Sequence, residues 1–486
     1  MKARHVLWFI LSCIAGLAIL GLVFPRDGIN ILGFHLEFPH PTEVIIGDTI
    51  TKIDVEETIK KQTNYMSEAE VRSHLDSIRA LKDFAQNSPS RLHYPDDNRE
   101  FFYPLFEDLT NAKRNKKIIR FVHYGDSQIE IDRISEELRE SFQEIFGGSG
   151  PGMIPAIQTI PTRAVSQDYS GDLHRYTIYG NVESRANHNR YGGMALVTEV
   201  EGSATINIRT RVTAKPRAKS FNTVKVLLGN CKPGFKCYGK AGYNNLETKS
   251  IDTQSKSPTL LEWTLPKDVS SATLNFEGNG EIYGIILEAD HGVSVDNIPM
   301  RGCSGTIFTR MDSLVLSQSL QKANTRLIIM QYGGNVMPVV NNEKKVDWFG
   351  EQIAKQITFL QNVCPESQIL FIGPSDMSTN IKGSMLTRPF LIDVNNKLKE
   401  TALKNGAAYW DMFSAMGGEN SMSQWVNASP PLASSDYIHF TQLGADKIGE
   451  MLFVAFNNDY TMFKISKKVR ESKNKKQSIS QKEDEQ

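Results

Sequence analysis

The sequence predicts an α/β protein whose parallel sheet is sandwiched by helices, with an all-β sandwich inserted into that domain and a transmembrane helix at its N-terminus. Three observations lead to this class. Short apolar runs alternate with helical segments, a long central stretch alternates apolar and polar residues, and an apolar run lies near the start. At 486 residues the chain is long enough for more than one folded unit.

The parallel sheet is predicted from three short apolar runs, at residues 118–124, 326–332 and 368–373. Segments with helical periodicity follow two of them, at 348–360 and 391–403. Strands that alternate with helices favour a parallel sheet that is covered on both faces.

The middle of the chain, from about residue 165 to 290, has a period of two instead. Ala204, Ile206 and Ile208 alternate with polar neighbours, and glycines and polar turns separate such runs at hairpin-like intervals. This pattern predicts an all-β insertion, interpreted here as a sandwich.

The first residues differ from the rest of the chain. Lys2, Arg4 and His5 precede an almost wholly apolar run at residues 6–24. About 19 apolar residues nearly cross a bilayer, and a basic flank stays on the cytoplasmic side, so we expect a signal anchor that exports the chain beyond residue 25. A cleaved signal peptide is the alternative, although its apolar region is usually shorter and ends at small residues.

These patterns divide the chain into six predicted segments. They are the anchor (1–26), a stalk (27–66), the first part of the α/β domain (67–164), the inserted sandwich (165–291), the second part of the α/β domain (292–463) and a disordered polar tail (464–486).

Charge and cysteine content narrow the function. Lysine plus arginine (55) balances aspartate plus glutamate (55), so we expect no nucleic-acid partner. Cys231 and Cys237 flank a turn-like loop, where either a disulfide or two unrelated small residues fit. No cysteine and histidine cluster has zinc spacing, so neither a metal nor another cofactor is expected.

Ser127 is the first candidate for chemistry. It directly follows a predicted strand, in Gly125-Asp126-Ser127, and precedes a predicted helix. The carboxyl edge of a parallel sheet binds ligands, and the N-terminus of a helix favours a developing negative charge. The same tripeptide is also common turn chemistry, so a nucleophilic role requires a base nearby.

Asp436 and His439 offer that base. A spacing of three lets the carboxylate orient the imidazole from the same segment, just before a helix that Thr441 can cap. Taken alone, this pattern is commonplace. Asn335 ends the second predicted strand and can aim its amide at an oxyanion, and the backbone N–H of Gly302 or Gly305 can do the same.

These four segments occur in the order of the sequence blocks of the SGNH/GDSL hydrolase superfamily, which the chain resembles over about residues 118–165 and 292–456. The resemblance implies a flavodoxin-like sheet and a catalytic triad. Its implied residues are Ser127 as nucleophile, His439 as base, Asp436 as the group that orients it, and an oxyanion hole of Ser127, Gly302 (Gly305 in reserve) and Asn335.

The stretches at residues 123–130 and 409–425 are similar to the branch that contains bacterial peptidoglycan and polysaccharide O-acetyl esterases and related O-acetyltransferases. Members of that branch can carry an inserted sandwich that resembles a carbohydrate-binding module, and the region 165–291 fits that plan. Ile131 departs from the pattern, where a glycine is expected, and Arg301 stands where asparagine is frequent.

The resemblance implies a serine esterase that removes acetyl groups from an extracytoplasmic glycan such as peptidoglycan or polysaccharide, at the cell surface or in the periplasm. One alternative is a glycan O-acetyltransferase that works with a membrane-bound O-acyltransferase. Another is a glycan-binding protein that has lost catalysis, which the presence of all three triad residues argues against.

Overall fold

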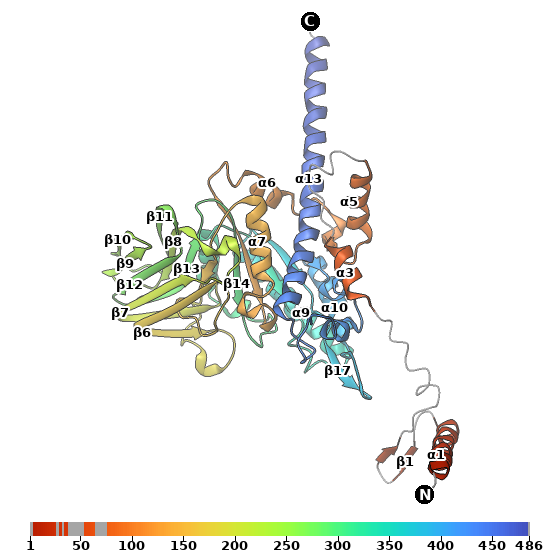
Figure 1. The fold of residues 1–486 in the computed structure, drawn as a ribbon. Coiled ribbons are helices and arrows are strands. Elements are labelled where there is room, and N and C mark those ends of the chain that lie inside the picture. The colour runs from red at the N-terminus through yellow and green to blue at the C-terminus, as the bar shows by residue number, and fades with distance from the viewer. Residues whose placement is uncertain (1–2, 26–28, 32–33, 37–52, 64–74, 485–486) are drawn as a thin grey trace. The chain divides into compact units, whose positions relative to one another are not determined.

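The computed structural model describes residues 3–25, 29–31, 34–36, 53–63 and 75–484 (Figure 1). The chain divides into two units, Met1–Ile53 and Asp54–Gln486. The first unit contains helix α1 (Ala3–Val23) and an antiparallel pair of short strands, β1 (Ile29–Ile31) and β2 (Phe34–Leu36). Most of the predicted stalk lies outside the described residues.

The expected transmembrane helix at residues 1–26 is overturned. Among the described residues, no helix combines the length and the apolar character that a bilayer crossing requires. A crossing takes about 20 consecutive apolar residues, and Arg4, His5 and Ser12 lie within the 21 residues of α1.

The second unit is a mixed α/β fold, and its central sheet has six strands in the order β14-β4-β15-β16-β19-β3. Five of them run parallel, and the short edge strand β3 is antiparallel to β19. The strands are β14 (Gly292–Pro299), β4 (Ile118–Gly125), β15 (Thr325–Gln331), β16 (Gln368–Ile372), β19 (Ala408–Trp410) and β3 (Leu92–His93).

Helices cover both faces of this sheet, which explains why its strands are apolar throughout. Helices α8 (Ser313–Lys322), α9 (Glu343–Val363) and α10 (Leu391–Lys404) share one hydrophobic core with one face. Helices α6 (Tyr103–Asn111), α7 (Ser135–Phe146) and α13 (Gln442–Asp484) share another core with the opposite face.

A second sheet of nine strands encloses a third core, and all of its pairings are antiparallel. Figure 1 shows its strands gathered beside α7. The predicted domain boundaries remain a prediction, because residues 54–486 form one compact unit. The strands are β5 (Gly152–Ile154), β6 (Val165–Thr177), β7 (Leu196–Thr210), β8 (Phe221–Gly229), β9 (Phe235–Ala241), β10 (Asn244–Ile251), β11 (Thr259–Val269), β12 (Ser271–Glu277) and β13 (Gly280–Glu288).

Smaller elements complete the second unit. They are α3 (Val55–Gln62), α5 (Leu75–Asn87), α11 (Met412–Ala415), α12 (Ser421–Val426), the hairpin β17 (Ser378–Ile381) and β18 (Ser384–Thr387), and the 3₁₀ turns η1 (Pro95–Asp97), η2 (Ser127–Asp132), η3 (Val182–Ser184), η4 (Pro216–Lys219) and η5 (Phe308–Arg310).

A buried charge network joins the two sheets. Arg120 on β4 pairs with Asp296 on β14 at 2.5 Å and with Glu288 on β13, and its Nε donates to the carbonyl of Ala323 at 2.9 Å. Lys225 on β8 lies 3.2 Å from Glu288. The guanidinium therefore compensates carboxylates of both sheets at once.

The structure bears on two further features that the sequence singled out, the cysteine pair and the polar tail. Cys231 and Cys237 are free thiols packed in the core of the nine-stranded sheet, so the disulfide is not formed. Burial raises the pKa of Cys231 to about 12, which keeps this thiol protonated and unreactive. The structure describes α13 as continuing through the polar segment after residue 463 to Asp484.

Candidate active site

The structure brings Ser127, His439 and Asp436 together, although Ser127 is far from the other two in the sequence. Ser127 follows the carboxyl end of β4, and its Oγ lies 2.7 Å from Nε2 of His439. Nδ1 of His439 lies 2.7 Å from Oδ2 of Asp436. This is the geometry by which a carboxylate orients a histidine that can take a proton from serine.

The loop that carries Asp436 holds its carboxylate in place. Oδ1 accepts hydrogen bonds from the backbone N–H groups of Ile438 and His439, at 2.9 and 3.0 Å. Partial burial alone would raise the pKa of Asp436, but these bonds and the His439 ring outweigh it and hold the pKa below its ordinary value. The carboxylate thus stays ionised at neutral pH.

Sequence reasoning missed two residues that join the serine turn to the histidine loop. Gln128 donates to the carbonyl of Ile438 at 2.6 Å. Arg133 donates to the carbonyls of Ser127 and Phe440, at 2.6 and 3.0 Å. Both residues lie close to Ser127 in the sequence, which was the one hint of a role in the site. The carbonyl groups that they bind can be identified only from the fold.

Ser127 does not begin a long helix as the sequence predicted. It begins the 3₁₀ turn η2, with Asp126 as its cap, and α7 starts only at Ser135. The strong dipole of a full helix therefore does not point at Ser127. Electrostatic help for an oxyanion has to come from individual N–H groups.

Asn335 lies beside the serine, but its amide is engaged. Nδ2 donates to Oδ2 of Asp126 at 2.8 Å and approaches the carbonyl of Cys303 at 3.4 Å. Gly302 is exposed and does not line the pocket around Ser127. Gly305, the reserve, donates its N–H to Sγ of Cys303. The predicted oxyanion hole of Ser127, Gly302 and Asn335 therefore remains a prediction, with Asn335 and Ser127 lining the same pocket.

The pocket around Ser127 lies at the carboxyl edge of the parallel sheet, where open α/β folds bind ligands. Asp126, Ser127 and Gln128 line one side, and the histidine loop lines another. The remaining lining residues are Gln331, Tyr332, Gly334, Asn335, Pro338, Gly373, Pro374, Ser375, Met377, Arg388 and Met412.

Asp126 gives a testable dependence of stability on pH. Burial raises its pKa to about 6, against the opposing hydrogen bonds from Gln128 and Asn335. This folded pKa lies above the ordinary 3.8, so the group stabilises the fold fully below about pH 4, and that contribution is lost as the pH rises through 6. Relative to Asp126→Asn, the wild-type protein should lose about 2 kcal/mol of unfolding free energy between pH 4 and pH 7. Urea unfolding at several pH values measures this difference.

Asp436→Asn is a matched control of opposite sign, because the folded pKa of Asp436 is lowered. The stability that Asp436 contributes is present above its unfolded pKa and is lost as the pH falls. A difference between wild type and Asp126→Asn that stays constant from pH 4 to pH 7 would contradict the assignment for Asp126.

Ile131 stands where the SGNH pattern has a glycine, and its backbone adopts the left-handed conformation that favours glycine. Its φ is +61°, and Asp132 and Ile134 also have positive φ values. A β-branched residue is disfavoured there, so this turn is strained. Ile131 does not narrow the pocket around Ser127; it lines a neighbouring hollow with Arg175 and Tyr179.

Replacing Ile131 with glycine should raise the unfolding free energy by about 0.5–1 kcal/mol, because the relief of strain exceeds the entropy cost of glycine. The side chain is 43% exposed, so little burial is lost. Ile145→Gly is the control, since Ile145 is 40% exposed but lies within α7; it should lose about 1 kcal/mol. Thermal and urea unfolding measure the stability of both variants. Equal destabilisation of Ile131→Gly and Ile145→Gly would contradict the claim that the backbone at Ile131 is strained.

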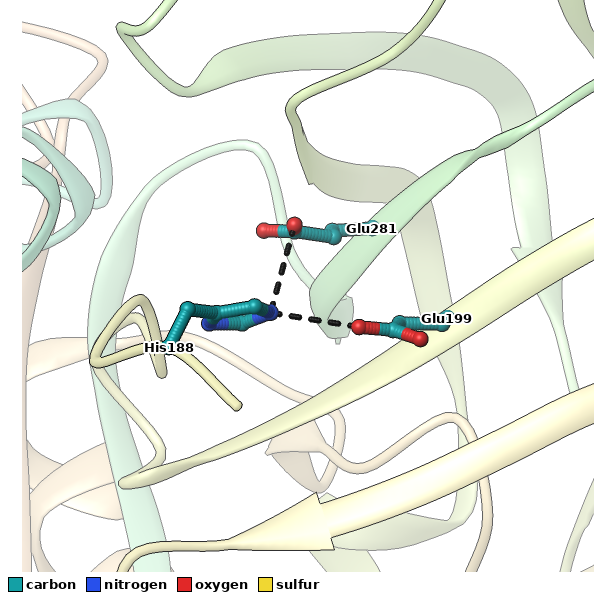
Figure 2. Close-up of side chains that lie close together, drawn as sticks. All are labelled: His188, Glu199 and Glu281. Carbon is teal, nitrogen blue, oxygen red and sulfur yellow. Dashed lines mark hydrogen bonds and ion pairs between the residues drawn. The ribbon is translucent and has the colours of Figure 1, made fainter. Parts of the chain in front are cut away.

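A second cluster of ionisable residues lies on the nine-stranded sheet and its neighbouring loop (Figure 2). Nε2 of His188 lies 3.1 Å from Glu199 and 3.5 Å from Glu281. Burial alone would raise the pKa of Glu281, but hydrogen bonds from Arg190, Tyr283 and Asn230 lower it. Because the Arg190 guanidinium already occupies both oxygens of Glu281, the set is better suited to an ion-pair network than to a cation.

Comparison with known proteins finds similarity in structure but not in sequence. No protein-family model matches the chain, and no curated protein matches it. A solved structure of a peptidoglycan O-acetylesterase is similar, with 20% identity, a TM-score of 0.60, and coverage of 74% of this chain and 96% of that chain. This similarity shows that the two chains share a fold.

Two other solved structures are more distant. A family two carbohydrate esterase from Cellvibrio japonicus has 7% identity and a TM-score of 0.25, with coverage of 62% of this chain and 99% of that one. A GDSL-like lipase from Parabacteroides merdae has 10% identity and a TM-score of 0.26, with coverage of 34% and 74%. No finding supports the partner acyltransferase of the alternative interpretation.

Proposed function

We propose that this chain is an SGNH-type serine esterase that removes short acyl groups, acetyl above all, from a glycan outside the cytoplasm. The observation that carries the proposal is the continuous chain of two 2.7 Å contacts, from Ser127 through His439 to Asp436. The similarity in fold to a peptidoglycan O-acetylesterase supports a glycan ester as substrate.

In the proposed reaction, Oγ of Ser127 attacks the ester carbonyl while Nε2 of His439 takes its proton. The imidazolium that forms is stabilised by the ionised Asp436, which also fixes the ring orientation. His439 then protonates the departing sugar hydroxyl, and water attacks the acyl-serine with His439 as base. Every proton transfer therefore passes through His439.

The oxyanion requires donors that the resting geometry only partly provides. Asn335 lines the pocket, yet its amide faces Asp126. We therefore assign Asn335 to the oxyanion hole on condition that it turns toward the substrate when the ester binds, together with the N–H of Ser127.

The test is acetate release by the purified protein from O-acetylated peptidoglycan and from acetylated xylan. Ser127-dependent release from either glycan supports the esterase. No release from either, with no activity on p-nitrophenyl acetate, would refute it. Transfer to a sugar hydroxyl, the alternative from sequence, is checked in the same samples by mass spectrometry of added oligosaccharides.

A further inference from the structure

Arg388 is an unpaired cation on the lining of the pocket that contains Ser127. It is partly exposed, and the structure gives its guanidinium no hydrogen bond or ion pair with any residue that it describes. The other charged groups on this lining are already engaged. Asp126 accepts from Gln128 and Asn335, and His439 contacts Ser127 and Asp436.

Hydrogen bonds position the backbone of Arg388 and of the hairpin before it. Arg388 follows the hairpin β17–β18, and its N–H donates to the carbonyl of Met377 at 2.8 Å. The preceding Thr387 donates to the buried carboxylate of Asp376 at 2.8 Å. The N–H of Ser378, in the same hairpin, donates to the carbonyl of Tyr437 at 3.0 Å, so the hairpin is tied to the loop that carries Asp436 and His439.

Two other polar groups of the lining residues also lack partners. Nε2 of Gln331 and the hydroxyl of Tyr332 are buried without a hydrogen-bond partner among the described residues. Oε1 of Gln331 lies 3.0 Å from Nε2 of His123, so only the NH₂ group of the Gln331 amide is left without a partner. Because both atoms are buried from solvent, contact with a ligand in the pocket falls to the partly exposed Arg388.

A single unpaired guanidinium on the pocket lining suits a ligand group that carries one negative charge. A guanidinium binds a carboxylate through two parallel hydrogen bonds, which gives both affinity and orientation. We propose that the pocket beside Ser127 selects carboxylate-bearing glycans, with Arg388 binding a carboxylate on the sugar that carries the ester or on its neighbour. The proposal rests on the esterase function above and names the substrate class of the same site.

A matched pair of substrates isolates the carboxylate. Acetylated glucuronan and acetylated glucan oligosaccharides of equal length, linkage and acetylation differ by a carboxylate in place of a hydroxymethyl group. The readout is the ratio of kcat/KM for the acidic substrate to that for the neutral one, from acetate release. The wild-type ratio should exceed one and should fall between 50 and 500 mM NaCl as the charges are screened.

Arg388→Gln should lower this ratio about 10- to 100-fold, mainly through KM for the acidic substrate. Arg388→Lys should keep part of the wild-type ratio, because lysine retains the positive charge but lacks the planar guanidinium that donates two parallel hydrogen bonds. Arg114→Gln is the control, because Arg114 is exposed and precedes the amino end of β4, opposite the edge that carries Ser127. A ratio in Arg388→Gln within twofold of wild type, or an equal loss on both substrates, would overturn the proposal.

A binding experiment separates this proposal from the esterase itself. Calorimetric titration of the Ser127→Ala protein with glucuronan oligosaccharides that carry no acetyl groups should show binding that Arg388→Gln weakens. This result holds whether or not Ser127 is the nucleophile. Binding that does not depend on Arg388 would count against the carboxylate site even if acetate release depends on Ser127.

Discussion

Replacing Ser127 with alanine should lower kcat on p-nitrophenyl acetate and on an acetylated glycan by a factor on the order of 10⁴ to 10⁶. The substitution removes the Oγ that lies 2.7 Å from Nε2 of His439, and with it the covalent route. Burial changes little, so the variant should fold and melt like wild type. Initial rates and a fluorophosphonate label, which should mark wild type alone, measure the effect.

Ser313→Ala is the matched control for this variant, because Ser313 is exposed at the start of α8. It should retain wild-type rates and labelling. A Ser127→Ala protein that keeps most of the activity would remove the basis of the esterase proposal. A protein that loses activity together with its cooperative unfolding would point to a structural role for Ser127 instead.

Replacing Arg120 with methionine should cost about 3–5 kcal/mol of unfolding free energy. Arg120 is fully buried between Asp296 and Glu288. Burial already raises the pKa of Asp296 against the opposing charge of Arg120, so removal of the guanidinium leaves buried carboxylates that must take up protons or stay uncompensated. Urea unfolding at pH 7 measures the loss.

Arg114→Met provides the comparison, since an exposed arginine should change stability by less than about 0.5 kcal/mol. In addition, Arg120→Met combined with Glu288→Met should cost less than the sum of the two single changes, because the pair is then removed together. A loss for Arg120→Met of under about 1 kcal/mol would contradict a compensating role for the guanidinium.

Several elements could be predicted because their physical cause is local. The apolar runs at 118–124, 326–332 and 368–373 correspond to β4, β15 and β16, since strands buried on both faces are continuously apolar. The helical segments at 348–360 and 391–403 lie in α9 and α10. The edge strands β14 and β3 carry a weaker signal and were not among the predicted strands.

The prediction of a transmembrane helix failed, because the composition of the segment was taken as sufficient. The apolar N-terminal segment forms α1 but does not qualify as a transmembrane helix. For Cys231 and Cys237 the sequence left two alternatives open, a disulfide or two unrelated residues, and the structure shows two free thiols, because cysteine spacing does not determine how the core packs around each thiol.

For the candidate site, the sequence by itself nominated Ser127, Asp436, His439 and Asn335, since each lies beside a recognisable strand end or helix start. Tertiary structure alone decided which groups meet. It set His439 against Ser127, turned the amide of Asn335 toward Asp126, and placed Arg388 on the pocket lining. Contacts between residues hundreds of positions apart depend on how strands and loops pack, and local sequence patterns do not encode that packing.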